Sequence, residues 1–80
     1  MNVTVIVTLK PTVLDPQGST IHRNLEALGF FGVDGVRQGK HFEIQISDDL
    51  DRSERQALVE RLAADVLTNP VIEEYRIVWE

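Results

Sequence analysis

The 80-residue sequence contains no cysteine, which excludes disulfide bonds, a thiol nucleophile and thiolate metal ligands. Aromatic residues make up only 6% of the chain, so few side chains could stack on nucleic-acid bases. Positive charge is also scarce: Lys and Arg number 8 against 13 Asp and Glu, and a net charge of −5 argues against a nucleic-acid partner. No apolar run approaches the ~20 residues that span a bilayer, so a membrane partner is not expected either.

The length of the chain predicts one small domain covering residues 1–80. A domain of this size buries only about 60% of its unfolded surface, so its core is thin and association with other chains is favoured. The first residues lack the basic and apolar regions of a signal peptide. We therefore expect a cytoplasmic protein, in keeping with the missing cysteine.

The middle of the chain alternates between two faces. Phe42, Ile44 and Ile46 share one face, a period of two that predicts a half-buried strand. A shorter extended run precedes it and ends at Gln38. The pair Gly39-Lys40 between the two runs suits a tight turn, which predicts a hairpin. A single long strand bent at Gly39 is the alternative interpretation.

A strand and a helix are predicted before this stretch. Residues 2–9 form a strand with an inward valine face. Asp15 and Pro16 are typical of a helix start, and Gly29 is a natural stop. The helix carries an apolar stripe of Ile21, Leu25 and Leu28.

A helix and a strand are predicted after it. Asp51 with Glu54 resembles a capping box, and the helix is expected to continue to Leu67. Its apolar stripe is Leu58, Leu62 and Val66, widened by Val59, Ala63 and Leu67. Asn69-Pro70 ends the helix. The last strand is expected over residues 71–79, with Tyr75 and Trp79 as large anchors.

This order predicts an α+β, ferredoxin-like βαββαβ sandwich, an antiparallel sheet with two helices on one face. The other sheet face is then bare in a monomer, and a second copy of the chain is its simplest partner. We expect that face to carry Thr4, Ile6, Thr8, His41, Glu43, Gln45, Arg76 and Val78.

Catalytic and metal-binding patterns are lacking. His22 and His41 have no metal-ligand spacing, and the acidic run around Asp48 is better explained by helix capping than by a calcium loop. The segment Gly35–Lys40 is no phosphate-binding loop, because no Ser or Thr follows the lysine. The residues alone predict a binding or assembly module without an active site of its own.

Five stretches of the sequence together resemble the PurS family, the small subunit of phosphoribosylformylglycinamidine (FGAM) synthase. They are Val7–Pro11, Val13–Gly18, Leu28–Phe30, Val36–Lys40 and Leu67–Tyr75. The resemblance implies a non-catalytic accessory subunit of a purine (IMP) biosynthesis enzyme. Such a subunit bridges a glutaminase, PurQ, and an ATP-dependent synthetase, PurL, and assists ammonia transfer between them. It implies no cofactor in this chain, because PurL binds the ATP and Mg²⁺.

The resemblance further implies a homodimer, or a tetramer of two dimers, when the chain is isolated. Carried over by position, the candidates for partner contacts are Lys10, Arg37, Lys40 and Asn69, with Asp15 and Gly39 beside them. Lys10, Arg37 and Lys40 are the better ones, because Asp15, Gly39 and Asn69 already have structural roles as a cap, a turn and a helix stop. The candidates for an oligomer face are Ile6, Val78, Thr4 and Thr8. A small-ligand regulatory domain of the ACT type, which shares the predicted topology, is the alternative function.

Overall fold

The computed structural model describes residues 1–80 and confirms the ferredoxin-like α+β class. Its elements are β1 (Asn2–Leu9), α1 (Pro16–Ala27), β2 (Gly39–Gln45), α2 (Arg52–Leu62), the π-helix η1 (Ala63–Leu67) and β3 (Glu73–Trp79). The sheet order is β2-β1-β3, with β1 antiparallel to both neighbours. The unit β2-α2-β3 therefore crosses over the sheet with β1 between its two strands.

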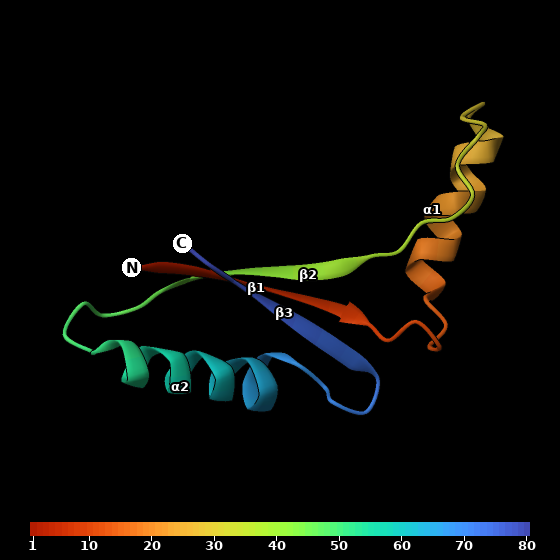
Figure 1. Ribbon diagram of the computed structural model, residues 1–80. Coiled ribbons are helices and arrows are strands. Elements are labelled where there is room, and N and C mark those ends of the chain that lie inside the picture. Colours follow the sequence, from red (N-terminus) through yellow and green to blue (C-terminus); the bar gives the residue numbers. More distant parts are fainter.

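The molecule consists of a body and an arm (Figure 1). The body is the sheet with α2 on one face, and the arm is α1 together with the segment 28–38 that runs back beside it. The extents of 51 × 24 × 14 Å reflect how far the arm reaches. The prediction that both helices cover one face of the sheet is wrong for α1, which stands away from the sheet (Figure 1).

The predicted central hairpin is also wrong, and with it the fourth strand. Residues 33–38 form no strand, and Gly39-Lys40 makes no turn but begins β2, with Gly39 opposite Thr8. The bent-strand alternative fails for the same reason, because the segment before Gly39 pairs with no strand. Its polar groups bond instead to the start of α1 and the end of β1.

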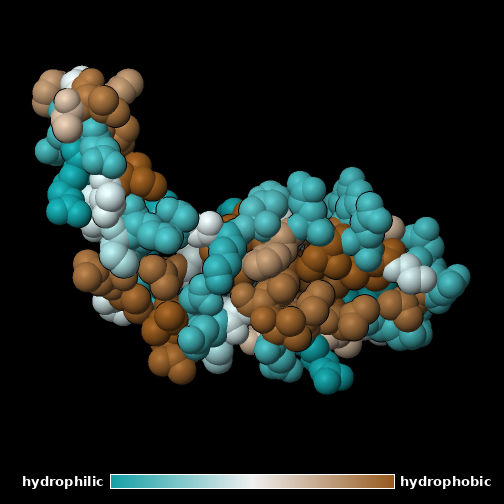
Figure 2. All heavy atoms as spheres, turned by 180° about the vertical axis from the view of Figure 1, so that it is seen from behind, coloured by the Kyte–Doolittle hydropathy of each residue, from teal (hydrophilic) through white to brown (hydrophobic).

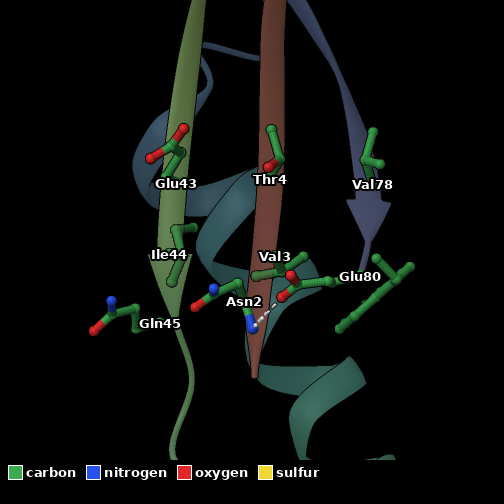
Figure 3. Close-up of a pocket in the computed structure, with 9 residues that line it drawn as sticks. Asn2, Val3, Thr4, Glu43, Ile44, Gln45, Val78 and Glu80 are labelled. Atoms are coloured by element: carbon green, nitrogen blue, oxygen red, sulfur yellow. Dashed lines mark hydrogen bonds between the residues drawn. The ribbon is translucent and has the colours of Figure 1, made fainter.

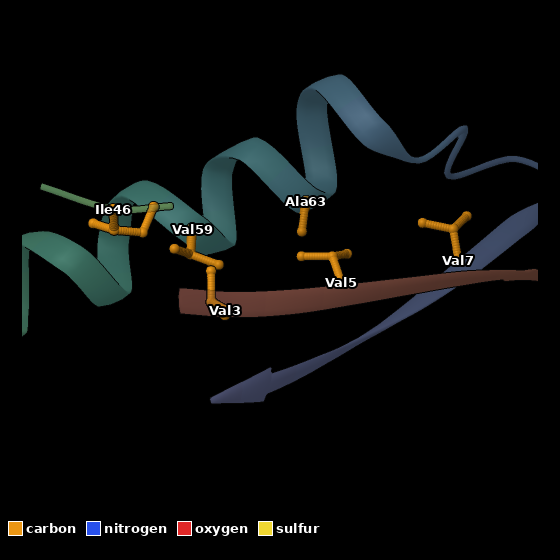
Figure 4. Packing of buried hydrophobic residues seen from close by; sticks show 6 residues of the cluster. All are labelled: Val3, Val5, Val7, Ile46, Val59 and Ala63. Carbon is orange, nitrogen blue, oxygen red and sulfur yellow. The ribbon is translucent and has the colours of Figure 1, made fainter. Parts of the chain in front are cut away.

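The core lies between β1 and α2 (Figure 4). Val3, Val5 and Val7 are buried on the inner face of β1, which confirms the predicted valine face. Val59 and Ala63 pack on them from above. Only 8 of the 80 residues are buried, so this core is small even for the length of the chain.

The face of α2 that enters the core is the edge that was predicted to widen the apolar stripe, Val59, Ala63 and Leu67, and not its predicted centre. Val59 is fully buried, whereas Leu58 is 46% and Val66 is 70% exposed. The centre and the edge of this stripe are adjacent on the helix and equally apolar, so hydrophobic periodicity alone does not show which of them faces the sheet. The helical stretch continues to Leu67 as predicted, although its last part, from Ala63, is the π-helix η1.

The predicted caps at both helix starts and the predicted stop after α1 are confirmed. The side chain of Asp15 accepts the N–H of Gly18 before α1, and that of Asp51 accepts the N–H of Glu54 before α2. Gly29 adopts a φ of 89° just after α1, a conformation that glycine adopts without strain. The last strand begins at Glu73, two residues later than expected. No helix is both long and apolar enough to cross a membrane.

Candidate partner-contact site at the elbow

Asp15 holds the base of the arm to the segment that returns from its tip. Its Oδ1 accepts the backbone N–H of Gly18 at 2.9 Å, and its Oδ2 accepts that of Gln38 at 2.8 Å. The hydrogen bond from Gln38, and to a smaller extent that from Gly18, hold the pKa of the Asp15 carboxyl below its usual range. A carboxylate held in this way is a weak base, which suits a structural role.

Arg37 ties the same segment to the end of β1. Its Nη2 donates to the carbonyl oxygen of Leu9 at 2.7 Å and to that of Lys10 at 3.1 Å. A guanidinium offers several donors in a fixed plane, so one side chain can bridge two consecutive carbonyls. We call this junction, formed by Leu9, Lys10, Asp15, Gly18 and residues 36–38, the elbow.

Gly18 makes the elbow compact. A Cβ at this position would lie 2.3 Å from the carbonyl oxygen of Val36, a contact that no larger residue can make. The glycine therefore lets the backbone of the returning segment touch the first turn of α1. Sequence analysis missed this role, although a glycine in the first turn of a helix is a signal for close backbone approach.

A second set of contacts joins the elbow to the start of β3. Lys40 Nζ lies 3.6 Å from Glu73 Oε2, and Glu73 Oε1 accepts the backbone N–H of Asn69 at 2.8 Å. The side chain of Asn69 accepts the N–H of Val71 at 3.1 Å. Glu73 is thus the link between two predicted contact residues, and no local sequence pattern had indicated it.

The structure brings all four predicted partner-contact residues to this end of the body. Lys10 joins them because its backbone N–H donates to the carbonyl of Ile72 at 2.9 Å. A small cavity of about 160 Å³ lies among Asp15, Gln38, Lys40 and Glu73. Arg37 and Asn69 are occupied by internal hydrogen bonds, whereas the ammonium of Lys10 makes no ion pair or hydrogen bond. This arrangement can position charges for a partner protein.

The bare sheet face has the composition that the sequence predicted. Thr4 lies between Glu43 and Val78, and Ile6 lies between His41 and Arg76. Figure 3 looks onto this face with α2 behind the sheet, and shows the backbone N–H of Asn2 donating to Glu80 Oε2 at 3.2 Å. Thr8 lies further along β1 and completes the row of predicted oligomer-face residues.

Both histidines and several acidic residues outside the elbow have structural partners. His22 Nε2 donates to the carbonyl of Val33 at 2.6 Å, which fixes the returning segment against α1. Asp48 lies 3.1 Å from the N-terminal amine. No cluster of three or more His, Asp or Glu is placed to hold a metal ion.

Comparisons of the sequence and of the structure with known proteins indicate the same family. A family model described as PurS, phosphoribosylformylglycinamidine (FGAM) synthase, matches residues 2–80. The phosphoribosylformylglycinamidine synthase subunit PurS of Mycobacterium leprae is 45% identical over 74 residues, with 92% of this chain and 89% of the relative covered.

Two solved structures share the fold over nearly the whole chain. PurS of Methanocaldococcus jannaschii, described as one subunit of formylglycinamide ribonucleotide amidotransferase in the purine biosynthetic pathway, superposes with a TM-score of 0.83 at 38% identity, covering 96% of this chain and 92% of that one. A chain of the PurLQS structure from Thermotoga maritima gives a TM-score of 0.86 at 27% identity, covering 96% and 93%. This chain belongs to the PurS family and is an accessory subunit of phosphoribosylformylglycinamidine synthase in purine biosynthesis.

Proposed function

We propose that this chain bridges a PurL-type synthetase and a PurQ-type glutaminase and helps ammonia pass between them. The observation that carries the proposal is the likeness of 96% of the chain to part of the PurLQS structure from Thermotoga maritima. Because the chain belongs to the PurS family, we prefer this role to the alternative of a small-ligand regulatory domain of the ACT type.

The chemistry of the complex is, in this proposal, ATP-dependent formation of a C–N bond with glutamine as the nitrogen source. PurQ releases ammonia, PurL binds ATP and Mg²⁺, and this chain contributes no catalytic residue and binds no cofactor. Two of its carboxylates have structural roles that agree with that division. Asp15 and Asp51 have lowered pKa values because backbone N–H groups bond to their ionised forms, and such groups are poor proton acceptors.

We assign the partner contacts to the elbow. Lys10 presents an unpaired ammonium group there, and Arg37 holds the backbone that carries it. Lys40 and Asn69 lie beside the elbow, where Glu73 links them. In a chain with a net charge of −5, Lys10 and the adjoining Arg37 carry positive charge at one end, which suits an acidic surface on a partner, whereas Lys40 is already paired with Glu73.

Self-association in the cytoplasm completes the proposal. The open sheet face of Thr4, Ile6, Thr8 and Val78 mixes apolar and hydroxyl groups, a composition that suits contact with a second copy as well as with water. A homodimer through this face, or a tetramer of two dimers, is the expected state of the isolated chain.

Native mass spectrometry of the chain mixed with PurL and PurQ tests the bridge. We expect one complex containing all three proteins and a weaker complex with Lys10→Glu. Arg52→Glu is the matched control, because Arg52 lies at the start of α2, at the other end of the body (Figure 1). A complex of PurL and PurQ that forms equally well without this chain would overturn the proposal.

A further inference from the structure

The free end of the arm is apolar and aromatic. Leu28 is 73%, Phe30 is 59% and Phe31 is 80% exposed. We call Leu28, Phe30, Phe31 and Val33 the arm tip. Figure 2 shows hydrophobic atoms gathered at this end of the arm, at the upper left of the view. Two neighbouring phenylalanines in solvent leave a large apolar area uncovered, and such an area marks an interaction site.

The backbone of the arm tip is held in one shape. The backbone N–H of Phe30 donates to the carbonyl oxygen of Leu25 at 2.8 Å. On the other side of the turn, His22 Nε2 donates to the carbonyl oxygen of Val33 at 2.6 Å. Gly32 between them has a φ of 94°, a conformation that glycine adopts without strain. A turn that is already ordered loses less conformational entropy when it binds, so the tip is prepared for docking.

The body of the same chain does not cover the arm tip. Gly18 is packed against the backbone of Val36, and Asp15 accepts the N–H of Gln38, so the elbow holds α1 away from the sheet (Figure 1). The 12 residues of α1 carry the tip about 18 Å from the elbow, at a rise of 1.5 Å per residue. The apolar surface of the tip is therefore available to another molecule.

The charges beside the arm tip indicate the chemistry of that molecule. Glu26 and Asp34 adjoin the tip in the chain, whereas both lysines lie at the opposite end of the arm. Arg23 lies further from the tip along α1 and donates to Thr20 Oγ1 at 3.4 Å. An anionic membrane surface attracts clustered basic residues, so this acidic border does not suit one. It suits a protein pocket with an apolar floor and a positively charged rim.

A chain that bridges two proteins needs two separate contact surfaces, and the two ends of the arm differ in chemistry. The elbow is polar and carries Lys10 and Arg37, whereas the tip is apolar with an acidic border. We propose, on the basis of the proposed bridging role, that the tip inserts into an apolar pocket with a positive rim on one partner enzyme while the elbow meets the other. Phe31 is the most exposed residue of the tip and acts as its anchor, since buried aromatic side chains contribute most at interfaces.

Photo-cross-linking in the assembled complex tests which protein meets each end of the arm. One chain carries p-benzoylphenylalanine in place of Phe31, and a second carries it in place of Leu14, which is 78% exposed beside the elbow. Each is mixed with PurL and PurQ and irradiated, and the linked protein is identified by mass. We expect the tip probe to label one of the two enzymes and the Leu14 probe to label the other.

A matched pair of variants measures what the anchor contributes. We expect Phe31→Ser to raise the Kd of the three-protein complex about tenfold or more, with an unchanged melting temperature. Val66→Ser, at a residue of the body that is 70% exposed, should change the Kd little. A tip probe that labels neither enzyme or the same one as the Leu14 probe, or equal weakening by both variants, would overturn the tip contact and leave the bridging role standing. Failure of the three proteins to form a complex would overturn both.

Discussion

The carboxylate of Asp15 accepts the backbone N–H of Gln38 at 2.8 Å, although the two residues are 23 positions apart. The same carboxylate caps α1 through Gly18. One side chain therefore fixes both the start of the helix and the segment that returns from its end, and the direction of the arm depends on it.

Removing this carboxylate should loosen the arm without unfolding the body. In Asp15→Ala the amide hydrogens of Gly18 and Gln38 lose their acceptor, and we expect each to exchange about tenfold faster. The core amides of β1 should be unaffected, since the core lies under α2. Hydrogen exchange by NMR measures both. Asp49→Ala is the control with the same loss of charge, and equal acceleration in that variant would contradict the role of Asp15.

The acid stability of the fold should depend on Asp15 and Asp51. Both have a pKa below the reference value of 3.8, chiefly through the N–H of Gln38 for Asp15 and of Glu54 for Asp51. A lowered folded pKa stabilises the protein above the unfolded pKa, and this contribution is lost as pH falls through the folded value. The urea concentration at the unfolding midpoint should therefore decrease as the pH is lowered below about 4. The decrease should be less steep in Asp15→Ala/Asp51→Ala. Parallel curves for the two proteins would exclude this explanation.

Gly18→Ala tests the close approach at the elbow. Alanine favours a helix by up to about 1 kcal/mol over glycine. Here its Cβ would meet the Val36 carbonyl oxygen at 2.3 Å, and backbone must move to relieve the clash. We expect a net destabilisation of roughly 1–3 kcal/mol, measured by thermal or urea unfolding. Gly35→Ala is the matched control because its Cβ would enter open space, and it should be tolerated.

Val59→Ala tests which face of α2 forms the core. Val59 is fully buried against β1, so losing its two methyl groups should cost about 2 kcal/mol. Val71→Ala removes the same groups from a residue that is 78% exposed and should change stability by less than about 0.5 kcal/mol. Equal melting temperatures for the two variants would mean that a different face of α2 packs on the sheet.

Local signals explain the parts of the structure that the sequence predicted well. Asp15, Asp51 and Gly29 act on backbone groups within a few residues, and the alternating valines of β1 show their buried face directly. The resemblance to the PurS family also rested on short local motifs, several of which meet at the elbow.

The errors arose where distant contacts decide the conformation. The segment before Gly39 would have an extended sequence pattern whether it joined the sheet or lay along the arm. Only the bonds to Asp15 and from Arg37 determine that it lies along the arm. The choice between Leu58 and Val59 as the core residue of α2 depends on where the helix sits over β1. Such information is absent from local periodicity.

Glutamine-dependent formation of FGAM by purified PurL and PurQ, measured with and without this chain, tests the bridging role most directly. The account predicts that the chain alone turns over no substrate and that adding it restores the glutamine-dependent rate. The rate with ammonium chloride as the nitrogen source should not depend on it, because free ammonia needs no bridge. A full glutamine-dependent rate from PurL and PurQ without this chain would contradict the account.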